Sequence, residues 1–227
     1  MLPDARPDHP NAWTTDSVRS KSDISYLLSA EELSALDDAL NAVKASGLAV
    51  EEVTTVDFPL GIMEETVARW IKEIDYGKGL VLLQGIEVSK YSKEDCALIF
   101  WGLGAHMGEA QSQSLAGDRL GHVVNLGGDN PRYRAYQNST ELALHTDATD
   151  IVGMMCLVPA SEGGLSGYAG AAAIYNELAM HHPQLLPTLC EGFHYHLLAS
   201  MPRESRPSPR KRYRSFRKRT VASVSVI

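Results

Sequence analysis

The chain has 227 residues, of which 44% are hydrophobic and 22% charged, and this is the composition of a globular domain with a substantial core. No run approaches the roughly eighteen consecutive apolar residues of a membrane span, and the polar start, residues 1–13, lacks the apolar segment of a secretory signal. The three widely spaced cysteines, Cys96, Cys156 and Cys190, indicate reduced thiols in a cytoplasmic protein.

The net charge of −7 is unevenly distributed along the chain. Residues 201–227 hold nine Lys and Arg against one acid, Glu204, which leaves residues 1–200 with a formal charge of −15. This basic stretch is low in complexity and cannot bury a core. It is interpreted in three ways: as a nuclear-localisation or nucleic-acid patch, as a disordered tail, or as sequence foreign to the fold, such as a translated intron. The last is favoured, and a nucleic-acid partner is not expected.

The first part of the chain predicts an arm followed by a helix. Residues 1–28 are expected to form an irregular arm, with Trp13 anchoring it on the body. Ser29-Ala30-Glu31-Glu32 is a capping box, in which the Ser and Glu side chains bind each other's backbone N–H groups at a helix start. Apolar residues then recur at helical spacing up to Gly47, which is a typical C-terminal cap.

Two further helices and two strands are predicted next. A helix is expected over residues 62–76, because its apolar residues share one face. The short apolar run Leu80–Leu83 lies between glycines and is typical of a buried strand. Ser92 begins a third predicted helix that ends near His106. Residues 122–126 are predicted to form a strand, and the polar segment 127–140 a loop.

The remaining elements are predicted from three local patterns. The apolar run 151–157 is expected to be a buried strand. A glycine turn at 162–166 follows it, and then a helix from about Ala172 to His181. Residues 193–198 alternate in the manner of a strand.

His145-Thr146-Asp147, just before the apolar run, places an imidazole and a carboxylate two residues apart. Side chains at this spacing point to the same side of an extended backbone. One nitrogen and one oxygen ligand then converge, which suits a divalent metal, and a further His would complete the facial triad of non-haem iron oxygenases. The alternative is an ordinary loop triplet with local hydrogen bonds.

Together these motifs resemble the TauD/TfdA family of Fe(II)- and 2-oxoglutarate-dependent dioxygenases, the taurine hydroxylase-like and clavaminate synthase-like enzymes, and its fungal members in particular. The matching features are the H-T-D triplet before an apolar strand, G-G-x-S at 163–166, Y-N-E-L at 175–178 and H-P-x-L-L at 182–186. Upstream, G-L-V-L-L-Q-G at 79–85 and the glycines Gly102, Gly104 and Gly108 also agree. The likeness covers about residues 10–198.

The resemblance implies an α+β fold, a double-stranded β-helix of the jelly-roll type with flanking helices, in a partial, C-terminally truncated domain over residues 29–200. It also implies iron held by His145, Asp147 and a distal His, with 2-oxoglutarate as co-substrate and O2 as oxidant. The Ser166 hydroxyl would contact 2-oxoglutarate; its alternative role is that of an ordinary turn residue. The substrate would be a small molecule, for instance in secondary metabolism.

Two hypotheses about function follow. The first is a dioxygenase that hydroxylates or otherwise oxidises a small molecule. The second is a truncated, catalytically inactive dioxygenase-like fold. It arises because no position matches the family's distal His or the Arg that would bind the far carboxylate of 2-oxoglutarate. His194 and His196 are the late histidines with strand-like spacing, and neither is assigned as a ligand.

Overall fold

A computed structural model describes residues 8–112, 117–124, 142–147 and 149–194, together with the backbone of two further strands at 212–213 and 222–226. The α-helices are α1 (Ala30–Ser46), α2 (Glu64–Tyr76), α3 (Lys93–Ala105), α4 (Ala171–His181) and α5 (Leu186–Glu191). The strands are β1 (Ser25–Leu27), β2 (Leu80–Gln84), β3 (Ile151–Met155), β4 (Phe193–His194), β5 (Arg212–Tyr213) and β6 (Ala222–Val226). Short 3-10 turns are η1 (Lys21–Asp23), η2 (Val50–Glu52), η3 (Gly61–Met63), η4 (Val88–Lys90) and η6 (Pro183–Leu185).

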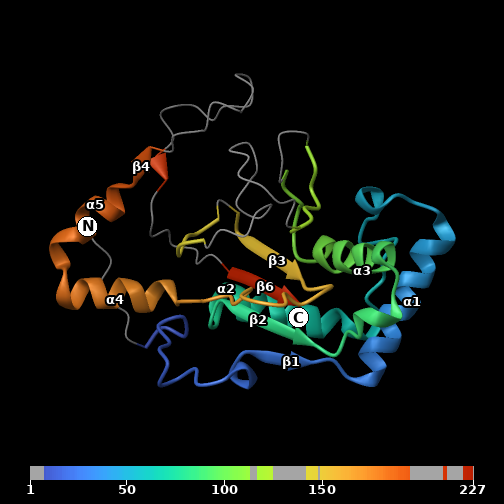
Figure 1. Ribbon diagram of the computed structural model, residues 1–227, viewed down its shortest axis with the longest axis horizontal. Coiled ribbons are helices and arrows are strands. Elements are labelled where there is room, and N and C mark those ends of the chain that lie inside the picture. Colours follow the sequence, from blue (N-terminus) through green and yellow to red (C-terminus); the bar gives the residue numbers. More distant parts are fainter. Residues whose placement is uncertain are drawn as a thin grey trace.

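Four of the strands form one sheet in the order β1-β2-β6-β3, and all neighbouring pairs in it are parallel. One row across the sheet aligns Ser25, Leu82, Ser225 and Met154. Strands β4 and β5 form a separate antiparallel pair. Helices α1 and α3 lie at one end of the four-stranded sheet and α4 and α5 at the other (Figure 1). The fold is α+β.

The double-stranded β-helix expected from the resemblance stays a prediction. A jelly roll is built from antiparallel strands, whereas the described strands give one parallel sheet and one antiparallel pair. None of the helices in the described ranges has the length and apolar character needed to cross a bilayer.

Strand β6 lies inside the segment expected to lack regular structure, residues 201–227. Its backbone pairs with β2 on one side and with β3 on the other. The expectation of disorder therefore does not hold for Arg212–Tyr213 and Ala222–Val226. The physical reason for β6 is local: the basic run ends at Arg219, and the valines that follow alternate with serines, which favours a strand.

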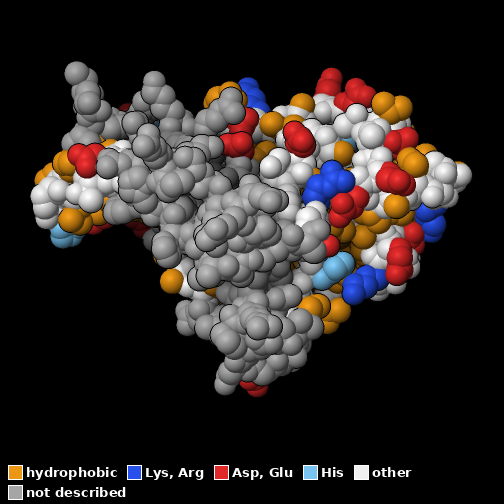
Figure 2. All heavy atoms as spheres, turned by 90° about the horizontal axis from the view of Figure 1, so that it is seen from above, with side chains coloured by type: hydrophobic (Ala, Val, Ile, Leu, Met, Phe, Trp, Pro, Cys, Tyr) orange, Lys and Arg blue, Asp and Glu red, His pale blue; other side chains and the backbone are white. Residues whose placement is uncertain are grey.

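The hydrophobic core is built almost entirely from the first half of the chain. Of the buried hydrophobic residues in the described ranges, all but Tyr175 and Leu186 precede residue 106. The largest fully buried side chains are Phe58, Leu36, Met63, Ile74, Leu83, Ile99, Val43 and Val67. All three cysteines are free, and only Cys96 is fully buried. Figure 2 shows Asp and Glu side chains spread over the described surface near α1 and α3, in agreement with the acidic charge of the body.

The predicted helices of the first half are confirmed, and their ends show why. The Ser29 hydroxyl accepts a hydrogen bond from the Glu32 N–H, and the Glu32 carboxylate accepts one from the Ser29 N–H at 2.9 Å. Gly47 closes α1 with a φ of +68°, a conformation that favours glycine. The same reciprocal box begins α3, with Ser92 and Asp95. The expected strand at 80–83 is β2, and it is buried.

Three other predictions differ from the structure. Strand β1 lies inside the arm that was expected to be irregular, because it gains its hydrogen bonds from β2. Residues 122–124 carry no strand, and the rest of that predicted strand, like the loop 127–140, lies outside the described residues. Strand β3 exists as predicted but is only partly buried, with the Met154 residue 45% exposed.

Candidate metal site

His145 and Asp147 lie in residues 142–147, a described segment without regular secondary structure that precedes β3 in the chain. Their side chains are 54% and 52% exposed. The His145 Nε2 atom and the Asp147 Oδ1 atom are 3.9 Å apart, so the two groups face each other as the two-residue spacing predicts. The structure thus brings together the two side chains that sequence analysis assigned to a metal.

The orientation of the His145 ring is set by the backbone. Its Nδ1 atom lies 2.8 Å from the carbonyl oxygen of Ala143. A carbonyl oxygen only accepts hydrogen bonds, so Nδ1 carries the proton and donates it. In the neutral ring Nε2 then has a free lone pair, and this is the atom that faces Asp147. Metal-bound histidines are held in the same way, with one ring nitrogen donating to a carbonyl and the other free to bind.

The donor set fits a divalent metal ion. Neighbouring ligands of an octahedral ion lie about 3 Å apart, because each bond is about 2.1 Å long. The pair would have to close by about 1 Å, and two half-exposed side chains can rotate by that much. Within the described ranges, no group of three His, Cys, Asp or Glu residues is arranged to hold an ion. The assignment of His145 and Asp147 as ligands stays a prediction.

Ser166 lies in the expected glycine turn after β3. Gly163 and Gly164 both have positive φ angles, +70° and +68°, so this turn needs two glycines in succession. A Cβ on Gly164 would also stand 2.8 Å from the Cβ of Ala160. The Ser166 side chain is exposed, and among the described residues no hydrogen bond or ion pair joins it to His145 or Asp147. Its contact with 2-oxoglutarate remains a prediction.

The Ala143 carbonyl oxygen, which holds the His145 ring, was not predicted from the sequence. A backbone oxygen leaves no signature in the residue type, so only the position two residues upstream could have suggested it. Of the late histidines, His194 is described only as part of the β4 backbone, and His196 lies outside the described residues. Neither is placed relative to the pair.

Comparison with known proteins identifies the class. The family described as "Taurine catabolism dioxygenase TauD, TfdA family" matches residues 42–223, and the chain belongs to this family. The match continues past residue 198, where the recognisable motifs end, and reaches the first residues of β6. It therefore does not favour the interpretation of the basic stretch as foreign to the fold.

Two curated relatives are similar over most of this chain. FR-33289 synthase of Streptomyces rubellomurinus is 28% identical over 179 residues, which are 78% of this chain and 53% of that protein. Taurine hydroxylase-like protein SAT17 of Stachybotrys chartarum is 25% identical over 189 residues, 79% of this chain and 49% of that protein. The chain thus spans about half the length of these relatives.

Proposed function

We propose that this protein is an Fe(II)- and 2-oxoglutarate-dependent dioxygenase that hydroxylates or otherwise oxidises a small molecule. Membership of the TauD/TfdA family supports the oxygenase class. The names of the two relatives, a synthase and a taurine hydroxylase-like protein, support a biosynthetic or tailoring reaction on a small molecule. The observation that carries the proposal is the His145 ring, whose Nδ1 is bound by Ala143 and whose Nε2 faces Asp147.

The residues of this chain would act by binding and orienting. His145 would ligate the metal as a neutral imidazole, and Ala143 would keep its Nε2 lone pair available. Asp147 would add the negative charge that a divalent cation favours. The Ser166 hydroxyl would donate a hydrogen bond to a carboxylate oxygen of 2-oxoglutarate. Iron, when bound, supplies the activation of oxygen, while the protein positions the reactants. We also propose that the complete fold is a jelly-roll barrel that holds the metal at its open end.

An anaerobic titration with Fe(II) and 2-oxoglutarate tests the proposal. The expected result is a visible metal-to-ligand charge-transfer band that saturates with 2-oxoglutarate. His145→Ala and Asp147→Ala should each abolish or strongly weaken the band, because removing one of the two proposed ligands lowers metal affinity by orders of magnitude.

His181→Ala is a matched control. The His181 Nε2 atom lies 3.6 Å from a carboxylate oxygen of Glu177 on helix α4, and its side chain is 54% exposed, as that of His145 is. This pair resembles the candidate site in its groups and exposure but lies outside the triplet. Its loss should leave the band unchanged. Folded wild-type protein without a band, or a band that survives His145→Ala, would contradict the proposal and favour an inactive fold.

A further inference from the structure

Asn11 is a polar residue that is only 3% exposed, and both ends of its side-chain amide are hydrogen-bonded to distant parts of the chain. Its Nδ2 donates to the carbonyl oxygen of Lys78 at 2.6 Å. Its Oδ1 accepts from the backbone N–H of Ala172 at 3.1 Å. Lys78 lies just before β2, and Ala172 lies in the first turn of α4. Asn11 therefore joins the arm, the sheet and helix α4. We call the contacts of Asn11 with Lys78 and Ala172 the Asn11 joint.

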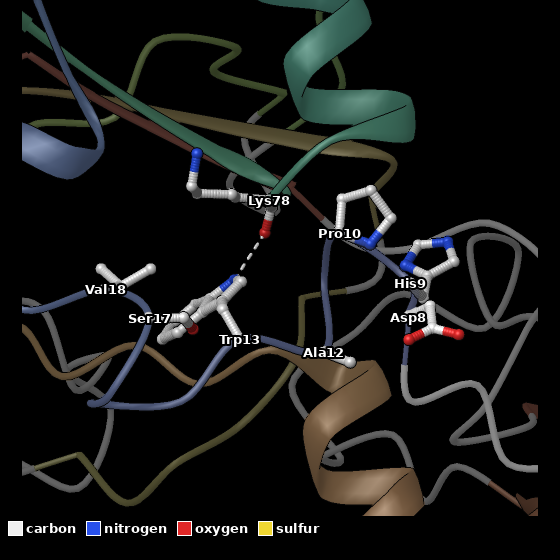
Figure 3. Close-up of a pocket in the computed structure, with 8 residues that line it drawn as sticks. All are labelled: Asp8, His9, Pro10, Ala12, Trp13, Ser17, Val18 and Lys78. Carbon is white, nitrogen blue, oxygen red and sulfur yellow. Dashed lines mark hydrogen bonds between the residues drawn. The ribbon is translucent and has the colours of Figure 1, made fainter.

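Trp13 adds to this joint. Its indole Nε1 donates to the same Lys78 carbonyl oxygen at 2.8 Å, which confirms the predicted anchor of the arm. Figure 3 shows the arm passing between the turn at Lys78 and the beginning of helix α4. A carbonyl oxygen has two lone pairs, so it can accept from Asn11 and Trp13 together. Both lone pairs of the Lys78 carbonyl oxygen thus accept hydrogen bonds from residues of the arm.

Gly170 brings the arm close to the chain segment that precedes α4. A Cβ on Gly170 would overlap the backbone carbonyl oxygen of Asn11 and would stand 3.3 Å from the Nε1 atom of Trp13. Only glycine permits this close approach. This contact involves the Asn11 backbone and not its side-chain amide. It also holds the start of helix α4 against the arm.

Gly170 is also the point at which a long exposed segment returns to the body. Residues 158–169 are all exposed, and Gly170 is the first buried residue after them. This segment includes the glycine turn and Ser166. The position of the Ser166 hydroxyl therefore depends on where the chain is held at Gly170.

We propose that Asn11 is a positioning residue for co-substrate binding, because it holds Gly170 and the start of α4 against the sheet and so sets the path of the segment that carries Ser166. This inference rests on the proposed function, since it assigns 2-oxoglutarate to Ser166. Asn11 itself touches neither the metal nor the co-substrate. It acts through the backbone of residues 158–172.

The test uses Asn11→Ala with two measurements. The first is backbone hydrogen exchange of peptides covering residues 158–174, which needs no cofactor. The Ala172 N–H loses its acceptor in the variant, so exchange at the start of α4 should become faster than in the wild type. The second is the dissociation constant of 2-oxoglutarate from the anaerobic charge-transfer titration, which should rise about tenfold, as for other residues that orient a binding group.

A double-mutant cycle with Ser166→Ala separates positioning from general destabilisation. If Asn11 acts through Ser166, adding Asn11→Ala to Ser166→Ala should change the dissociation constant by less than about twofold. Gly170→Ala perturbs the same joint from the other side and should raise the constant as well. Gly104→Ala is the control, because a Cβ there meets nothing within 4 Å and Gly104 lies on helix α3, outside residues 158–172; it should change neither measurement.

The outcomes separate this inference from the proposed function. Unchanged hydrogen exchange at Ala172 in folded Asn11→Ala would contradict the claim that Asn11 holds the start of helix α4. This outcome does not depend on cofactor binding. Faster exchange with an unchanged dissociation constant overturns the positioning role, and so does full additivity with Ser166→Ala. A wild-type protein that shows no charge-transfer band contradicts the proposed function instead, while the exchange measurement still decides whether Asn11 holds helix α4.

Discussion

The ring of Phe58 packs directly on the backbone of Gly102, so closely that a Cβ on Gly102 would overlap the ring carbons. Phe58 is fully buried, with 0% of its surface exposed. Its carbonyl oxygen also accepts a hydrogen bond from His106 Nε2 at 2.7 Å. One residue of the loop before α2 therefore holds the second half of helix α3 through both its ring and its backbone.

We predict that Gly102→Ala lowers the free energy of unfolding by about 1–3 kcal/mol, because the added methyl group forces the buried Phe58 ring to move in a packed core. Gly104→Ala is the matched control on the same helix, since a Cβ there meets nothing within 4 Å. It should be neutral or stabilise the protein by up to about 1 kcal/mol, as alanine favours helices. Urea unfolding of both variants checks this, and equal effects would contradict it.

Glu32 carries a second prediction, which concerns pH. The Glu32 residue is 7% exposed, and its carboxylate accepts hydrogen bonds from the Tyr26 hydroxyl at 2.7 Å and from the Ser29 N–H at 2.9 Å. Burial alone would raise the pKa of Glu32, but these hydrogen bonds outweigh it and hold the pKa below its usual value of 4.5. Glu32→Gln should therefore lower the unfolding free energy at neutral pH by about 1–3 kcal/mol.

The lowered pKa also determines how the contribution of Glu32 to the unfolding free energy varies with pH. A carboxyl group with a lowered pKa in the folded state contributes its full stabilisation above its unfolded pKa and loses it as the pH falls through the folded value. The difference in unfolding free energy between wild type and Glu32→Gln should be constant above about pH 5 and shrink below it. Glu65→Gln, at an exposed Glu in the first turn of α2, removes the same charge and serves as control. A difference independent of pH would contradict the assignment.

We predict that the Tyr91 hydroxyl loses its proton at a higher pH than a free tyrosine does. Burial, and then the nearby Asp37 carboxylate that accepts a 2.8 Å hydrogen bond from its hydroxyl, raise the pKa of Tyr91 from 10.0 to about 12. The stabilisation from this hydrogen bond is present below pH 10 and is lost as the pH rises through 12. The difference in phenolate absorbance between wild type and Tyr91→Phe should stay flat through pH 10, where a free tyrosine titrates. Asp37→Asn should move the midpoint down.

Arg119 fixes the segment around residues 117–120 to the 3-10 turn η2. Its Nε donates to a carboxylate oxygen of Glu51 at 3.1 Å, and its guanidinium carbon lies 5.2 Å from the centre of the Trp101 ring. Arg119→Lys should lower the unfolding free energy by about 0.5–1 kcal/mol, because lysine keeps the charge but loses the planar contacts. Lys90→Arg, in the exposed pair with Glu87, should have little effect on the same urea measurement. Equal effects would contradict a special role for the planar group.

The helices of the first half could be predicted from the sequence because their signals are local. Capping boxes at Ser29 and Ser92 act within a few residues, and so do the cap at Gly47 and the apolar spacing between these ends. The buried strand β2 was also predicted, because a short apolar run between glycines has few alternatives. Elements whose signal and stabilisation are both local are the ones that a sequence reveals.

Elements stabilised by distant partners were harder to predict. Strand β1 has three residues and exists because it pairs with β2, so it does not stand out in its own residues. Strand β6 has a local alternation of valine and serine, but its place between β2 and β3 comes from pairing with distant strands. The partial burial of β3 depends on which elements cover its faces, which an apolar run does not specify. The pairing of His145 with Asp147 was predictable from their spacing, whereas the Ala143 carbonyl and the Asn11 joint were not, because they involve backbone atoms.

The place of β6 in the sheet has a consequence for synthesis of the chain on the ribosome. Among the described strands β3 pairs with β6 alone, and it gains this neighbour when residues 222–226 have been made. The buried residues before residue 106 can assemble once that part of the chain has been made, whereas β3 and β6 are far apart in the sequence, and contacts of this kind form slowly. Until then β3 lacks this partner, and we expect the nascent chain to depend on chaperones during this interval.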